Sequence, residues 1–210
     1  MDSVKEKASY CLGLLTGNNL KSQFADLNIP YALQGMQDAL EGETPKLEKE
    51  EISNILQSID AQMEQQKKET FKKLSAVNKE QGIAFLEKNK EMEGVHVLPS
   101  GLQYKILSRG NDQQDSPSLF DVVKIHYNGF SLDGRALESS YARGEPVTIP
   151  VNQAISGWAE ALQKMHIGDK WKLFVPSYLA YGASGVPPYI GPDQTLIFEL
   201  ELIGIQPKTG

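Results

Sequence analysis

The sequence predicts an α+β protein: an all-α N-terminal region, a long connecting helix, and then a curved antiparallel sheet with one short helix. Two observations carry this prediction. Of the eleven prolines, only Pro30 and Pro45 precede position 90. After Gly94 the apolar residues also change from a helical spacing to an alternating one, which is the change from period 3.6 to period 2.

Two helices are predicted in the N-terminal region, residues 1–46. The first runs from about Val4 to Leu20. The second, near Ile29 to Leu40, repeats its apolar residues at steps of four, three and four. Pro30 near its start and Gly42 just past its end are typical helix boundaries. One face of the first helix is predicted to carry the apolar residues Val4, Ala8, Cys11 and Leu15.

Gly13 and Gly17 lie four residues apart on the first helix. Small residues at this spacing permit close contact with another helix, or they are only weak points of the helix, and the sequence leaves both readings open. A helical region this short cannot easily build a core of its own. A second copy of the chain is therefore expected to complete it, which makes residues 1–46 a dimerisation region.

A long helix is predicted within residues 47–93, opened by Thr44-Pro45 and ending at about Asn89. Its apolar stripe fades between Gln62 and Lys73, so this part is expected to cross solvent between two packed regions. Gly82 is expected to weaken the helix without breaking it.

The C-terminal region, residues 94–210, alternates apolar and polar residues in the manner of strands. A short helix is predicted between Ile155 and Met165, with Trp158 on its apolar face. Such a helix plugs the concave side of a curved sheet, and a ligand pocket is expected between the two. The predicted strands are Leu102–Ile106, Val122–Tyr127, Val147–Val151, Lys170–Val175 and Thr195–Ile203.

The composition argues against several classes of partner and cofactor. A formal net charge of −6 argues against nucleic acid or an anionic membrane as the main partner. The single cysteine, Cys11, excludes an intramolecular disulfide, and the three histidines share no metal-ligand spacing, so no metal or cofactor is expected. No apolar run is long enough for a membrane span. A periplasmic or cell-surface location is favoured, with a signal peptide missing from this chain, and a cytoplasmic one stays open.

Several motifs follow one another in a fixed order from Val122 onward: HYNG, DGRALESS, RGEP, ISGW, MHIGDKW, VPSYLAYG and TLIFELEL. This order resembles the FKBP-type peptidyl-prolyl cis/trans isomerases. Upstream, KASYCLGLLTGNNL, LQGMQDALEG, QGIAFLEKNK and VLPSGLQYKIL are similar to the Mip and FkpA-like bacterial subfamily. The resemblance implies a homodimer joined through the N-terminal helices, and an isomerase that acts on unfolded or proline-containing protein clients with chaperone activity.

The chemistry of that family fits the residues present. Rotation about an X-Pro bond is slow because amide resonance sets a barrier of about 20 kcal/mol. A catalyst needs an apolar pocket and a few placed hydrogen-bond donors, and it needs no nucleophile, metal or base.

By resemblance, Trp158 forms the floor of the pocket, and Tyr127 and Phe198 form its walls. The backbone N–H of Ile155 and the hydroxyl of Tyr181 are expected to donate hydrogen bonds to substrate carbonyls. The other residues implied in the site are Glu138 among the catalytic groups, and Leu137, Val147, Ala154, Tyr189 and Ile190 as substrate contacts.

Two positions depart from the family's DGxxFDSS motif: Leu137 replaces a phenylalanine and Glu138 replaces an aspartate. Val147 is also aliphatic where an aromatic is common. These changes predict a wider, less aromatic pocket with weaker turnover and weaker binding of tacrolimus or rapamycin. They also keep open a second function, in which the chain is a catalytically weak or inactive chaperone or host-interaction protein.

Overall fold

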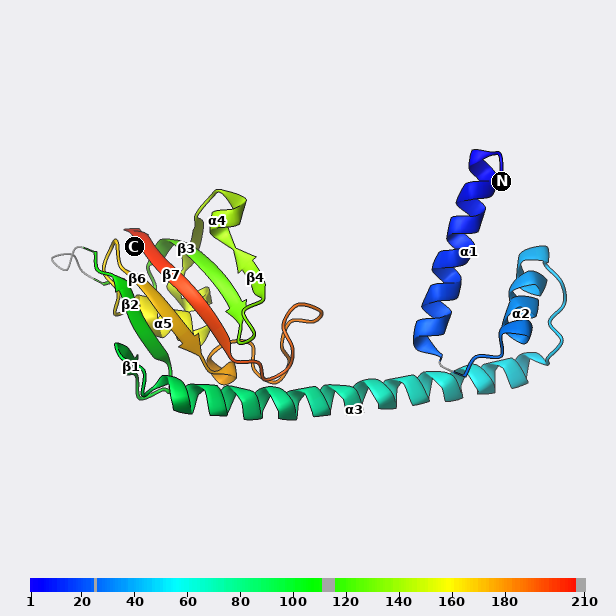
Figure 1. Cartoon of the computed structure of the whole chain (residues 1–210), viewed down its shortest axis with the longest axis horizontal. Helices are drawn as coiled ribbons and strands as arrows, with labels where there is room; N and C mark the ends of the chain where they lie inside the picture. Colours follow the sequence, from blue (N-terminus) through cyan, green and yellow to red (C-terminus); the bar gives the residue numbers. More distant parts are fainter. Residues whose placement is uncertain (25, 111–115, 207–210) are drawn as a thin grey trace. The chain divides into compact units, whose positions relative to one another are not determined.

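The computed structural model describes residues 1–24, 26–110 and 116–206. It confirms the predicted α+β class, with helices followed by an antiparallel sheet and a short helix (Figure 1). The chain divides into two compact units, Met1–Met63 and Glu64–Gly210. The domain limits expected after residues 46 and 93 stay a prediction. Within the described ranges, no helix combines the length and apolarity needed to cross a membrane.

The first unit contains α1 (Val4–Gln23), α2 (Ile29–Glu41) and the beginning of α3 (Lys49–Asn89). Short-range signals fix the ends of the first two helices. A reciprocal capping box joins Ser3 and Glu6 at the start of α1. Gly42 ends α2 in the left-handed conformation, with a φ of 74°, where glycine carries no steric penalty.

The face that α1 turns toward α2 differs from the predicted apolar stripe. Val4 and Leu15 are 85% and 66% exposed. The apolar residues of α1 are spread around the helix, so periodicity alone could not select the face. None of the residues described in α1 or α2 is buried. On α1, the groove beside α2 is lined by Ser9, Leu12, Gly13, Thr16, Gly17, Leu20 and Lys21.

Helix α3 runs unbroken from Lys49 to Asn89. Residues 64–74 are all exposed, as the polar sequence predicts. Farther along, Gly82 is buried. A Cβ atom placed on Gly82 would lie 2.3 Å from Oγ1 of Thr195, far inside van der Waals contact. The glycine is therefore required by the close approach of α3 to the segment before β7.

Replacing Gly82 with alanine is expected to destabilise the second unit by about 1–3 kcal/mol, because overpacking outweighs the better helix propensity of alanine. Chemical denaturation measures the free energy of unfolding. Thr195→Ala should relieve part of this cost when combined with Gly82→Ala. Equal stability of Gly82→Ala and the wild type would contradict the close contact between Gly82 and Thr195.

The second unit contains a seven-stranded antiparallel sheet in the order β1-β2-β6-β7-β3-β4, with β5 also paired to β3. All five predicted strands are present. Strands β1 and β4 were not predicted, because β1 has only three residues and β4 (Ala136–Ser139) contains few residue types that favour strands. The strands are β1 (Val95–Val97), β2 (Gln103–Ser108), β3 (Val122–Ser131), β4 (Ala136–Ser139), β5 (Val147–Pro150), β6 (Lys170–Val175) and β7 (Leu196–Gln206).

The core lies between the sheet and the short helix α5 (Ser156–Leu162), which lies behind the strands in Figure 1. Alternate residues of β3 and β7 are buried, which is the period expected of a sheet with one packed face. Trp158, Ala161 and Leu162 of α5 belong to the same buried cluster. The predicted helix therefore covers the sheet as expected, although it ends at Leu162 rather than near Met165.

Candidate active site

An aromatic cluster forms where α5 meets the two central strands. The Trp158 ring lies between Tyr127 of β3 and Phe198 of β7, with ring centroids 4.8 Å and 5.0 Å away. Both neighbours meet it edge to face, at interplanar angles of 64° and 84°, which is a favoured geometry for aromatic pairs. The structure thus brings together the three aromatic residues that were expected to form the floor and walls, named here the Trp158 cluster.

Gly129 explains how Phe198 reaches this position. The two residues are paired across β3 and β7. A Cβ atom on Gly129 would lie 2.9 Å from Cε1 of the Phe198 ring. Only glycine lets this ring lie across the neighbouring strand, which gives the glycine of the HYNG motif a structural reason.

Aliphatic side chains pack against the buried core to which the Trp158 cluster belongs. Five of the expected substrate contacts or donors are partly exposed and pack against the buried core: Leu137, Val147, Ala154, Ile155 and Ile190. Ile155 is the N-cap of α5, and Ala154 alone separates it from the 3-10 turn η1 (Val151–Gln153). In the part of the chain that the structure describes, no atom accepts a hydrogen bond from the Ile155 N–H. This donor is therefore available to a bound carbonyl.

Tyr181 and Tyr189 lie in the long connection between the 3-10 turn η2 (Ser177–Leu179) and β7. Tyr181 is 38% exposed, and burial, followed by the nearby Glu138 carboxylate, raises the pKa of its phenol above 10.0. Its hydroxyl therefore stays protonated at neutral pH and can donate. Tyr189 is 67% exposed.

Glu138 is held by Arg143, a residue outside the predicted site. Arg143 places Nη1 2.5 Å from Oε1 of Glu138 and Nη2 3.4 Å from the Tyr127 hydroxyl. Its guanidinium carbon also lies 5.8 Å from the centroid of the Tyr127 ring. The RGEP motif was the available signal, since its arginine, Arg143, is the last residue of the short helix α4 (Ser140–Arg143).

The charges around Tyr127 have mixed effects on its hydroxyl. Burial raises the pKa of the Tyr127 phenol above 10.0, while its hydrogen bond with Arg143 acts in the opposite direction. The same bond, together with Glu138, raises the pKa of Arg143. Arg143 and the Tyr127 hydroxyl therefore both stay protonated at neutral pH. The Glu138 side chain is 59% exposed, so the pair contributes little to stability.

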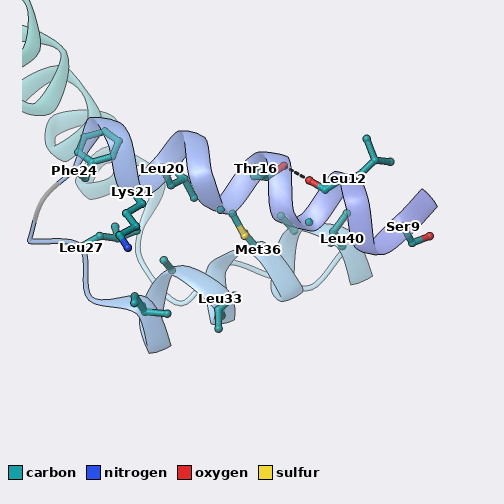
Figure 2. A pocket seen from close by; sticks show the side chains of 15 residues that line it. Ser9, Leu12, Thr16, Leu20, Lys21, Phe24, Leu27, Leu33, Met36 and Leu40 are labelled. Atoms are coloured by element: carbon teal, nitrogen blue, oxygen red, sulfur yellow. Dashed lines mark hydrogen bonds between the residues drawn. The ribbon is translucent and has the colours of Figure 1, made fainter. Parts of the chain in front are cut away.

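A groove between α1 and α2 is the second notable surface. It has a volume of about 930 Å³. Figure 2 shows Leu12, Leu20, Leu33 and Met36 from the two helices along it. Gly13 and Gly17 also line it, and a Cβ atom on either would meet nothing within 4 Å in the same chain.

Across residues 1–24, 26–110 and 116–206, no three histidine, cysteine, aspartate or glutamate side chains are grouped so that they could hold an ion.

Comparison with known proteins agrees with this geometry. Residues 113–203 match the family described as FKBP-type peptidyl-prolyl cis-trans isomerase, and residues 5–106 match the domain amino terminal to it. The chain is 40% identical over 202 residues to the outer membrane protein MIP of Legionella longbeachae, covering 96% of this chain and 86% of that protein. The chain belongs to the FKBP-type peptidyl-prolyl isomerase family. The resemblance in its motifs is confirmed.

Two further relatives place the chain in the bacterial branch of the FKBP family. The FKBP-type 22 kDa peptidyl-prolyl cis-trans isomerase of Escherichia coli is 38% identical, with 97% of both chains covered. The crystal structure of FkpA from Escherichia coli matches with a TM-score of 0.78 and 33% identity, covering all of both chains. The Mip and FkpA-like subfamily is therefore the correct one.

Proposed function

We propose that this FKBP chain accelerates cis/trans isomerisation of X-Pro bonds in protein clients, with the proline ring seated on the Trp158 cluster. The edge-to-face arrangement of Tyr127, Trp158 and Phe198 carries the proposal. Three aromatic rings offer a proline a rigid apolar surface at little cost in side-chain entropy. The aliphatic border of Leu137, Val147, Ala154 and Ile190 contacts the residues beside the proline.

The twisted amide of the transition state has lost its conjugation, so it is stabilised by removal of water and by positioning of its flanking carbonyls. The N–H of Ile155 and the hydroxyl of Tyr181 donate to these carbonyls. Arg143 holds the Glu138 carboxylate beside Tyr127, which keeps this edge of the site polar. No covalent bond changes, and no proton is transferred.

We expect Tyr181→Phe to lower kcat/KM on the peptide Ala-Leu-Pro-Phe about five- to tenfold, the effect of losing one hydrogen bond to a neutral acceptor. Wild-type activity should stay flat between pH 6 and 9, because a raised pKa keeps the Tyr181 hydroxyl protonated below its ordinary titration range. A protease-coupled assay measures both. Tyr178→Phe, outside the proposed site, is the matched control; a bell-shaped profile near neutral pH would point to a titrating group and against this mechanism.

The groove between α1 and α2 supports a dimer. Its lining is mostly apolar, and the helices that form it bury none of their described residues in a single chain. We infer that the N-terminal helices of a second copy fill it and cover this surface. Two linked isomerase domains then grip one unfolded client with a raised effective concentration, which accounts for chaperone activity.

Inhibitor binding and cellular location are two further proposals. The aliphatic Leu137 and Val147 remove aromatic contacts, so we propose weak binding of tacrolimus and rapamycin. We also propose a location in the bacterial envelope, supported by the name of the Legionella longbeachae relative, outer membrane protein MIP.

A further inference from the structure

Helix α3 contacts the connection that carries Tyr181, although the contacting residues are more than 110 positions apart in the sequence. The connection, residues 181–193, is named here the overhanging loop. Asp193 at its end is 7% exposed and adopts a φ of 54°, a left-handed conformation that is uncommon for residues other than glycine. The backbone N–H of Asp193 donates to the Gly182 carbonyl at 2.8 Å, which closes the loop at its base.

Three polar residues on one face of α3 hold this base. Ser75 Oγ donates to Oδ2 of Asp193 at 2.6 Å, and Lys79 Nζ lies 3.4 Å from the same oxygen. Asn78 Nδ2 donates to the Pro192 carbonyl at 2.7 Å. Ser75, Asn78 and Lys79 are named here the α3 clamp.

The packing leaves the overhanging loop little freedom to shift on α3. A Cβ atom on Gly191 would lie 3.0 Å from Asn78 Nδ2 and 3.4 Å from Cδ2 of Leu74. At the far end of the loop, Arg135 Nη2 donates to the Tyr189 carbonyl at 3.2 Å. The loop is therefore fixed at its base by α3 and near its tip by the turn before β4.

We propose that the α3 clamp positions the Tyr181 hydroxyl for catalysis, so that Ser75, Asn78 and Lys79 are positioning residues of the isomerase site. The proposal rests on the proposed role of Tyr181. A buried, left-handed Asp193 is a strained arrangement that persists only where its surroundings hold it. The hydrogen bonds from Ser75 and Asn78 supply that restraint, and Tyr181 lies one residue from Gly182, to which Asp193 bonds.

The test compares two triple variants of the full chain. Ser75→Ala/Asn78→Ala/Lys79→Ala removes the α3 clamp, and alanine preserves the helix. The control, Gln66→Ala/Lys72→Ala/Gln81→Ala, removes one positive charge and two uncharged polar groups from exposed positions of the same helix. Removal of the clamp is expected to speed amide hydrogen exchange in residues 181–193 about tenfold while β3 and β7 keep their protection. The control should match the wild type.

Activity shows whether the clamp acts through Tyr181. Loss of the clamp should lower kcat/KM on a proline peptide about three- to tenfold, and by much less when Tyr181→Phe is already present. A general loss of folded protein would lower activity equally in both backgrounds. Equal reductions in the two backgrounds, or unchanged exchange in the overhanging loop, would overturn the proposal.

Asp193→Asn provides a second variant with little risk of misfolding, since asparagine tolerates the left-handed conformation and still accepts from Ser75. It should keep at least half of the wild-type activity, because the ion pair that it loses involves a mostly exposed Lys79. A larger loss of activity would show that the charge on Asp193 positions Tyr181, and would contradict positioning by the hydrogen bonds of the clamp. If wild-type protein showed no isomerase activity, the proposed function would fail, and the exchange data alone would then decide whether α3 orders the loop.

Discussion

Replacing Gly13 and Gly17 with leucine is expected to convert the proposed dimer to a monomer at micromolar concentration. Both glycines line the groove between α1 and α2, and both have open space above them in the single chain. Leucine would fill the space that a second copy needs. Because leucine is also the better helix former, the substitution should not unfold α1 itself. Light scattering during gel filtration measures the mass.

Gly35→Leu is the matched control. A Cβ atom at Gly35 also meets nothing within 4 Å, and this residue of α2 does not line the groove. This variant should keep the wild-type mass. Removal of the residues before about Leu47 should likewise give a monomer, and that monomer should remain active on short peptides. A Gly13→Leu/Gly17→Leu variant that stays dimeric would show that the groove is not the interface.

Restoring the two altered positions, through Leu137→Phe and Glu138→Asp, is expected to raise kcat/KM on proline peptides about tenfold, the value of roughly 1.4 kcal/mol in the transition state. The ring returns an aromatic wall beside the Trp158 cluster. The shorter carboxylate draws Arg143 inward, because Glu138 now meets it with a mostly exposed side chain. The peptide assay measures the gain, and tacrolimus affinity should rise with it.

Leu137→Met separates the effect of the ring from that of side-chain volume, since methionine fills similar space without an aromatic face. It should leave kcat/KM near the wild-type value. The single variants Leu137→Phe and Glu138→Asp then show how much of the increase in kcat/KM comes from the aromatic ring and how much from the shorter carboxylate. Unchanged kinetics in the double variant would mean that neither departure limits catalysis in this chain.

Much of the fold could be predicted because its signals are local. Pro30 and Gly42 mark the ends of α2 within a few residues, and alternation marks β2, β3, β5, β6 and β7. The face of α1 could not be chosen, because its apolar residues surround the helix and the groove depends on how α2 folds back. Strands β1 and β4 escaped prediction because β1 has only three residues and β4 contains few residue types that favour strands.

The candidate site also has a part that the sequence predicts and a part that it does not. Motif order pointed to Trp158, Tyr127 and Phe198, and the structure brings these rings together. The clamp could not be predicted, because Ser75 and Asp193 are 118 positions apart and neither lies in a distinctive pattern. Contacts of this kind follow from the packing of residues 64–89 of α3 within the second unit, which sequence periodicity does not encode.

The most direct test of the central claim is exchange NMR of Ala-Leu-Pro-Phe with catalytic amounts of the protein, because it reports isomerisation and the site of binding together. The chain has two tryptophans, and the buried indole N–H groups of Trp158 and Trp171 both lack a hydrogen-bond partner among the described residues. We predict that cis/trans exchange accelerates in proportion to protein concentration, and that the Trp158 indole resonance shifts with added peptide while that of Trp171 does not. Exchange at the uncatalysed rate, or a peptide that leaves the Trp158 resonance unmoved, would contradict the account.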